Sequence, residues 1–284
     1  MVAHLLRSLT LATVMGSSLW QVAVSAQSPP ANPQAWTGPR TSDGQPDVQG
    51  FWRPVLAGGR SLEDPGVPGG LDDEILRKQG KAKRNPSRVV DPADGKVPYQ
   101  PWAAALRNDV IENEWDPTRP EHIDTQTRCF PLGVLRQAAN ANQILQPPGY
   151  FILINENYHV FRIIPLDGRP HLGNGIKLWQ ADSRGRWEGN TLVVESRNFN
   201  GKNRLSHEGD FVSENAHVVE RFTFADSKTL NYEVTITDPT VFTRPWTMRI
   251  PTVRSEQPAD YEMWESACHE GERSADLMAS DPKK

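Results

Sequence analysis

The chain has 284 residues, a formal net charge of −4 and only two cysteines. A charge so near neutral excludes the general electrostatic attraction by which basic proteins bind nucleic acid or anionic membrane surfaces. We therefore expect no nucleic-acid partner.

Residues 1–26 have the organisation of a secretory signal peptide. Arg7 stands before an apolar run over 9–24, and the segment 24–26 (Val-Ser-Ala) places small residues where signal peptidase cleaves. The run is broken by polar residues and is shorter than the roughly 20 apolar residues of a membrane-spanning helix, which argues against an anchor. No later segment approaches that length. We therefore expect a soluble mature protein, periplasmic or secreted, that begins after Ala26.

The part of the chain before residue 150 predicts little regular structure. Residues 27–46 are rich in proline, glycine and polar residues, and we expect them to form an extended lead-in. Residues 47–149 are interpreted as an arm packed on the rest of the protein. Its predicted elements are a short strand and two helices, near 48–52, 71–76 and 102–114. Because the arm has too few periodic segments for a core of its own, 47–284 is expected to be one domain.

From residue 150 to 267, short alternating segments are separated by turn residues. About eight strands are predicted, which is the number that closes a small barrel able to hold one ligand. They lie near 150–156, 158–164, 176–183, 190–198, 215–225, 229–238, 246–251 and 260–267. Hairpin turns are indicated at 167–168, 188–190 and 225–227. The sequence therefore predicts a mainly β fold, an antiparallel barrel, with an open two-sheet sandwich as the alternative.

Cys129 and Cys268 are the two cysteines. In an exported protein this number favours one disulfide bond, which would tie the segment before the strands to the last strand. Such a long loop would contribute roughly 2–4 kcal/mol to the free energy of unfolding. The alternative is a pair of free, buried thiols. The spacing excludes a CxxC redox pair and covalent haem attachment.

Several stretches of the chain resemble the motifs of one protein family. They are TSDGQPDVQGFW at 41–52, DGRPH at 167–171, GRWEGNTLVVE at 185–195, VERF at 219–222 and the segment 238–246. The family consists of uncharacterised secreted bacterial proteins, found in acidobacteria and proteobacteria. The resemblance implies export and a calycin- or lipocalin-like β-barrel, and it implies no particular activity.

Charged residues on apolar strand rows are the first candidates for a functional site. Glu220 alternates with Val218 and Phe222, and Arg162 shares a row with Ile164. An unpaired buried charge is costly, so each of these side chains needs a partner or a changed protonation state. A Glu220 whose pKa is raised by burial could act as a general acid or base. The alternative is a Glu–Arg pair that braces the barrel.

Histidines supply the second set of candidates. His171 lies in a predicted loop, whereas His217 precedes Glu220 by three residues and should point to the opposite face of its strand. His171 is therefore the better partner for Glu220. The side chains predicted to contact a ligand are Arg162, Trp179, Tyr232, His159 and His207. No HxH or HExxH spacing is present, so no metal site is predicted, although ligands from separate strands could still assemble one.

No motif of the chain specifies a reaction. There is no GxSxG elbow, no GxGxxG and no P-loop, so no cofactor is predicted. The favoured hypothesis is an exported barrel that binds a small, partly apolar molecule. It would act on that molecule by cofactor-independent acid–base chemistry of the hydratase, lyase or isomerase type, with Glu220 and His171 or His217 as acid and base. The alternatives are a non-catalytic lipocalin-like binding protein, a metal-dependent enzyme with a His/Glu site, and a structural envelope protein.

Overall fold

The computed structural model describes most of the chain after residue 35. The described residues are 36–56, 61–63, 86–138, 140, 142–158, 160–258, 260–263 and 266–268, with Arg273, Ala275 and Met278. Residues Pro33–Lys284 form one compact unit. The predicted signal peptide, the helix predicted over 71–76 and His159 lie outside the described residues.

Ten strands and three short helical segments make up the described fold. The strands are β1 (Gly50–Pro54), β2 (Val89–Asp91), β3 (Asn142–Leu145), β4 (Tyr150–Asn155), β5 (Phe161–Pro165), β6 (Asp182–Glu188), β7 (Thr191–Arg197), β8 (His217–Phe224), β9 (Thr229–Thr237) and β10 (Trp246–Arg254). The helical segments are α2 (Pro101–Asn113), the 3₁₀ helix η1 (Pro120–His122) and α3 (Val134–Gln137).

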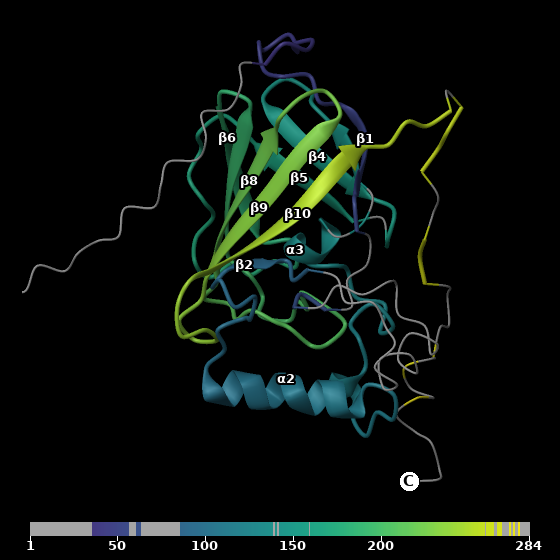
Figure 1. Cartoon of the computed structure of the whole chain (residues 1–284), viewed down its shortest axis with the longest axis vertical. Coiled ribbons are helices and arrows are strands. Elements are labelled where there is room, and N and C mark those ends of the chain that lie inside the picture. The colour runs from purple at the N-terminus through teal and green to yellow at the C-terminus, as the bar shows by residue number, and fades with distance from the viewer. Residues whose placement is uncertain are drawn as a thin grey trace, which may run out of the picture. The chain divides into compact units, whose positions relative to one another are not determined.

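The strands form one curled sheet that is nearly closed into a barrel (Figure 1). Their order is β5-β4-β3-β1-β10-β9-β8-β7-β6, and β2 pairs in addition with the start of β10. Every pairing along this path is antiparallel. A path of nine antiparallel strands has its two end strands running in the same direction. β5 and β6 therefore meet as parallel neighbours, which cannot continue the antiparallel ladder.

Side chains close the seam between β5 and β6. Gly185 of β6 faces Ile164 and Leu166, and a Cβ added to this glycine would lie 2.9 Å and 2.7 Å from their side-chain carbons. Arg162 reaches across the same seam and donates a hydrogen bond to Ser183 Oγ at 3.0 Å. The absence of a side chain at position 185 therefore allows β5 to pack closely on β6.

The sequence predicted the second half of the sheet well. Strands near 150–156, 158–164, 190–198, 215–225, 229–238 and 246–251 are confirmed, with the expected apolar rows facing inward, although β5 begins only at Phe161. The turn at 188–190 joins β6 to β7, and Gly189 has the positive φ of +64° that favours glycine there.

Three expectations about strands were wrong. Residues 176–181 are turns and irregular chain, and β6 begins only at Asp182. No strand covers the described residues of 260–267, where Ser266 makes a single bridge to Asn157. The segment 47–149, expected to pack on the barrel as an arm, instead supplies β1, β2 and β3 to the sheet. Nine strands, rather than about eight, therefore surround the core.

Aromatic rings fill much of the barrel interior. Trp52 packs edge-on against Phe224 with ring centroids 5.4 Å apart, and Phe222 contacts Tyr232 at 4.7 Å. All four residues of α3 are buried, and Val134 and Gln137 face the same internal space as Trp52. α3 therefore closes one end of the barrel, at the side on which α2 lies (Figure 1).

α2 confirms the helix predicted over 102–114 but is only lightly packed. Ala103 and Val110 are buried, whereas Trp102 and Leu106 are 51% and 41% exposed. The helix therefore contacts the rest of the protein through the narrow stripe that contains Ala103 and Val110, and its other apolar side chains stay exposed. Among the described residues, no helix combines the length and the apolar composition needed to cross a membrane.

A disulfide bond joins Cys129 to Cys268, as predicted. It fastens the C-terminal segment to the loop between η1 and α3, so Cys268 is not on a strand as expected.

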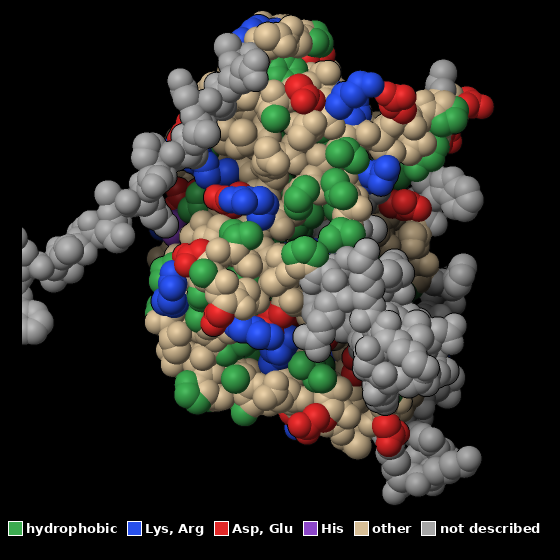
Figure 2. Space-filling view, in the orientation of Figure 1, with side chains coloured by type: hydrophobic (Ala, Val, Ile, Leu, Met, Phe, Trp, Pro, Cys, Tyr) green, Lys and Arg blue, Asp and Glu red, His purple; other side chains and the backbone are tan. Residues whose placement is uncertain are grey.

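On the face drawn in Figure 2, acidic and basic side chains are interspersed.

Candidate functional site

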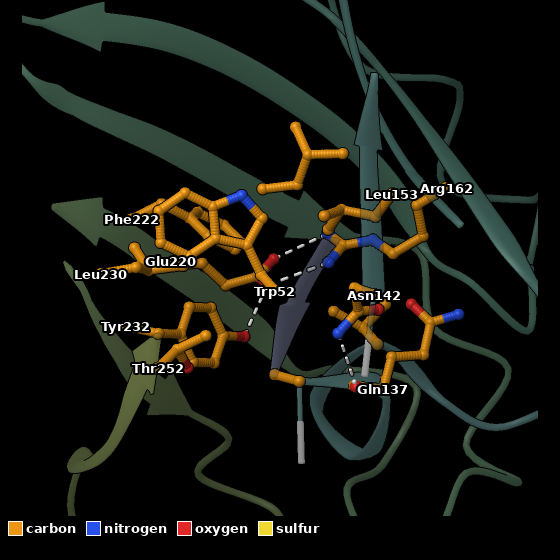
Figure 3. A pocket seen from close by; sticks show the side chains of 13 residues that line it. Trp52, Gln137, Asn142, Leu153, Arg162, Glu220, Phe222, Leu230, Tyr232 and Thr252 are labelled. Atoms are coloured by element: carbon orange, nitrogen blue, oxygen red, sulfur yellow. Dashed lines mark hydrogen bonds and ion pairs between the residues drawn. The ribbon is translucent and has the colours of Figure 1, made fainter. Parts of the chain in front are cut away.

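Glu220 and Arg162 form an ion pair inside the barrel. Arg162 Nη1 donates to Glu220 Oε1 at 2.9 Å, and Nη2 donates to Oε2 at 2.7 Å. Tyr232 donates its hydroxyl proton to Oε1 at 2.7 Å, and Ser196 Oγ lies 3.4 Å from Oε2. Figure 3 shows the Glu220 carboxylate between the guanidinium and the phenol. Glu220 is fully buried and Arg162 is 3% exposed. This is the bracing pair that the sequence analysis gave as an alternative.

The pKa values of Arg162 and Tyr232, the two partners of Glu220, are both raised. Burial alone would lower the pKa of Arg162, but the Glu220 carboxylate outweighs burial and holds that pKa above its usual value. Burial and the same carboxylate raise the pKa of Tyr232 well above its usual value, so its hydroxyl stays protonated and donates. The pair links β5, β8 and β9 through charge-assisted hydrogen bonds.

The space beside the ion pair is small. An internal cavity of about 30 Å³ lies among Trp52, Gln137, Arg162, Tyr232 and their neighbours. That volume is enough for one or two water molecules. Pockets for small-molecule ligands measure about 300–1,000 Å³. The barrel interior is therefore a packed core, and a ligand of the predicted kind has more room elsewhere.

Neither His171 nor His217, the two histidines predicted as acid–base partners of Glu220, lies near it. His171 Nδ1 is 2.8 Å from the Asp182 carboxylate at the start of β6, and His217 Nε2 is 2.9 Å from the Glu195 carboxylate. Alternation along β6 and β7 points Asp182 and Glu195 away from the inward-facing Ser183 and Ser196. Both histidines are therefore paired on the outer face, whereas Glu220 is held inside.

A second charged cluster lies at the end of the barrel that α3 closes. Arg136 binds the Asp124 carboxylate with both terminal nitrogens, at 2.7 Å and 3.0 Å, and its Nη2 also lies 2.8 Å from His207 Nε2. Burial would raise the pKa of Asp124, but the Arg136 guanidinium outweighs burial and holds it below its usual value. His207 is thus part of an ordered cluster at this end.

Next to this cluster is a groove of about 550 Å³ between α2, the segment 121–130 and the loop 201–211. Trp179, predicted as a ligand contact near the barrel mouth, lines it. Its ring stacks on Phe130, with centroids 5.1 Å apart and planes 19° from parallel. Leu106 and Phe211 add further apolar surface. The groove therefore has the volume and the aromatic surface of a small-molecule site.

Basic side chains accompany the aromatic rings of the groove. The Arg128 guanidinium lies over the Phe130 ring, 5.0 Å from its centroid. Arg204 and Lys202 line the groove as well. Burial lowers the pKa of Arg204, the sign of a cation with too few compensating anions. The groove is therefore apolar on one part of its wall and cationic on another.

The loop 201–211 is held firmly against α2. The fully buried Asp210 accepts hydrogen bonds from Tyr99 at 2.7 Å and Arg107 at 2.6 Å, and also from Ser206. Gly209, with a φ of +85°, brings the loop against α2, since a Cβ there would lie 2.8 Å from Val110. The groove is thus a preformed site on a fixed loop, which lowers the entropic cost of binding.

Two of the predicted ligand contacts lie at or beside this groove. Trp179 was named as a ligand contact, and His207 lies in the adjoining cluster. Phe130, Arg128 and Arg204 were missed because they come from segments without periodicity. Among the described residues, no group of three or more His, Cys, Asp or Glu side chains is arranged to hold a metal ion.

Comparison of the chain with models of known protein families and with curated proteins gave no match.

Proposed function

We propose that the protein is an exported binding protein for a small, partly apolar molecule, and that the molecule occupies the groove beside Phe130 and Trp179. The observation that carries this proposal is the stacked aromatic pair in a preformed groove of about 550 Å³. Aromatic rings that are already ordered can stack on a planar ligand without losing further side-chain freedom.

The contacts of Glu220 favour binding over acid–base catalysis. Both of its oxygens already accept hydrogen bonds from Arg162, and Tyr232 occupies a further position on Oε1. Protonation of Glu220 would leave the Arg162 charge buried without its counter-ion, which is strongly unfavourable. The pair is therefore better suited to stabilise the barrel than to exchange protons with a substrate.

Export completes the proposal. The first 26 residues have the pattern of a signal peptide, and a disulfide bond between Cys129 and Cys268 suits an oxidising compartment. We propose that the ligand is captured in the periplasm or outside the cell.

The test is titration of the purified protein with N-phenyl-1-naphthylamine, a neutral aromatic probe whose fluorescence rises on transfer to an apolar site. We expect saturable binding that Trp179→Leu weakens about tenfold, because an aromatic contact contributes about 0.5–1.5 kcal/mol beyond its buried area. Trp36→Phe is the matched control, since residues 36–48 lie at the end of the barrel opposite α2 (Figure 1). Binding that is equally strong in Trp179→Leu would contradict the proposal, as would conversion of a bound compound to product.

A further inference from the structure

We infer that the groove selects anionic aromatic ligands, with a carboxylate, sulfonate or phosphate group held by Arg204 and Lys202 beside the Phe130–Trp179 pair. This inference rests on the proposed function and adds the charge of the ligand to it. It is carried by the balance of charges around the groove and by the unused donors of its cations.

Three cations line the groove. Within the part of the chain that the structure describes, Arg128, Lys202 and Arg204 have no carboxylate within salt-bridge distance. Glu121 also lines the groove, but its side chain is exposed, and Arg204 contacts its backbone carbonyl rather than its carboxylate. An anion entering the groove would thus meet more positive than negative charge.

The carboxylates behind the groove are bound by other arginines. Asp124 is bound by both terminal nitrogens of Arg136. Arg107 binds Asp210 at 2.6 Å and Glu208 at 2.8 Å. Their direct ion-pair partners are therefore these arginines and not the cations that line the groove. Burial lowers the pKa of the Arg204 guanidinium even though the charges of Asp124 and Asp210 act to raise it.

Most N–H donors of Arg204 have no acceptor among the residues that the structure describes. A guanidinium carries five N–H donors in a planar fork. Among the described residues, the Arg204 side chain has one acceptor, the Glu121 carbonyl oxygen, which lies 2.6 Å from Nη2. The remaining donors match the geometry of a carboxylate, sulfonate or phosphate, which arginine binds through two hydrogen bonds at once.

The aromatic pair makes the same groove suitable for a ring attached to the anion. Phe130 and Trp179 form one continuous stacked surface, and Arg128 already lies over the Phe130 ring. A flat ligand can add to this surface while its acidic group faces Lys202 and Arg204. An aromatic acid fits both parts of the wall, whereas an inorganic anion fits only one.

Two fluorescent probes with the same ring skeleton test the charge directly. 1-Anilinonaphthalene-8-sulfonate carries a sulfonate that N-phenyl-1-naphthylamine lacks. We expect the full-length mature protein to bind the sulfonate probe at least tenfold more tightly than the neutral one. Raising the salt concentration should weaken binding of the sulfonate probe alone, because salt screens partly exposed charges.

Variants of the two cations assign the preference to the groove. Arg204→Met and Lys202→Met should each reduce the affinity for the sulfonate probe at least fivefold and leave the affinity for the neutral probe within about twofold. Arg204→Lys keeps the positive charge but loses the planar fork of donors, so it should reduce the affinity for the sulfonate probe less than Arg204→Met does. Arg249→Met, on the outer face of β10, is the matched control and should change neither affinity.

The outcomes separate this inference from the proposed function. Equal binding of both probes by the unmodified protein would overturn the inference and leave the proposed function standing. An equal loss of affinity for both probes in Lys202→Met and Arg204→Lys would also overturn it. Such a result would mean that these cations maintain the shape of the groove, which affects every ligand, and do not bind the sulfonate. Absence of Trp179-dependent binding for either probe would overturn both.

Discussion

At the scale of single residues, the interior of the barrel depends on one ion pair. Glu220 and Arg162 are buried together, and each satisfies the charge of the other through two hydrogen bonds. Burying two charges requires this geometry, because the loss of either partner leaves a charge in a medium of low polarity. The consequences of removing one partner are therefore larger than those of removing both.

We predict that Glu220→Gln lowers the free energy of unfolding by about 3–5 kcal/mol, the usual effect of breaking a buried ion pair. The double variant Glu220→Leu with Arg162→Met should recover a large part of that loss, because no unpaired charge remains. Urea denaturation of the single and double variants measures both quantities.

The pair Arg249–Glu233 is the matched control, since it joins neighbouring strands of the same sheet at 2.7 Å but is solvent-accessible. Glu233→Gln should change the free energy of unfolding by no more than about 1 kcal/mol. Similar losses for Glu233→Gln and Glu220→Gln would contradict the role assigned to the internal pair.

Asp124 gives the protein a predictable sensitivity to acid. Although burial acts to raise its pKa, Arg136 holds the folded-state pKa below the ordinary value of about 3.9. A carboxyl with a depressed folded pKa stabilises the protein above its unfolded pKa, and this contribution is lost as pH falls through the folded pKa. We expect Asp124→Asn to be less stable than the unmodified protein at pH 6, with a difference that shrinks as pH falls below about 4. Urea denaturation at pH 6 and at several pH values below 4 measures the difference, and Asp260→Asn at an exposed position is the control.

At the scale of elements, two properties decided which strands could be predicted from the sequence: the length of the strand and how apolar its inward-facing side chains are. β8, β9 and β10 have eight or nine residues with strict alternation, and all three were predicted. The strand predicted near 176–183 was misplaced relative to β6. The inward-facing residues of β6 are Ser183, Gly185 and Trp187, and only the last of these is a large apolar residue. β1 lies close to the short strand predicted near 48–52. β2 and β3 have only three and four residues, too few for a periodicity to stand out.

The candidate site was predictable only in part. The Glu220–Arg162 pair was visible in the sequence, since each charge interrupts an apolar strand row. The groove was not, because its walls come from α2 and from loops around residues 121–130, 179 and 201–211. Only a three-dimensional contact, such as Phe130 stacking on Trp179, brings those segments together.

Gly185 allows the seam between β5 and β6 to close, and we predict that Gly185→Val destabilises the protein by about 1–3 kcal/mol, the range of overpacked cores. The added side chain would enter the volume now filled by Ile164 and Leu166. Thermal or urea unfolding measures the change. Gly173→Ala is the control, because nothing lies within 4 Å of the added Cβ there, and it should change the free energy of unfolding by less than about 0.5 kcal/mol. Tolerance of valine at position 185 would show that the seam is looser than its packing implies.

At the scale of the whole molecule, the disulfide connects stability to the groove. Cys129 lies between Arg128 and Phe130, both of which line the groove, and its bond to Cys268 spans 139 residues of sequence. The backbone at Cys129 has a φ of +61°, an uncommon conformation for a residue other than glycine. The bond therefore fixes a segment that supplies both an aromatic and a cationic part of the groove wall.

We predict that Cys129→Ser with Cys268→Ser lowers the free energy of unfolding by about 2–5 kcal/mol, because the loop released in the unfolded state is long. The same variant should bind 1-anilinonaphthalene-8-sulfonate more weakly under conditions where it is still folded, since Arg128 and Phe130 lose their fixed position. Denaturant unfolding gives the first quantity and probe titration the second. Gly185→Val provides the comparison, because it should destabilise the protein without touching the groove and should leave the probe affinity unchanged. If the cysteine variant loses stability but keeps full affinity, the groove is held by Asp210 and α2 alone.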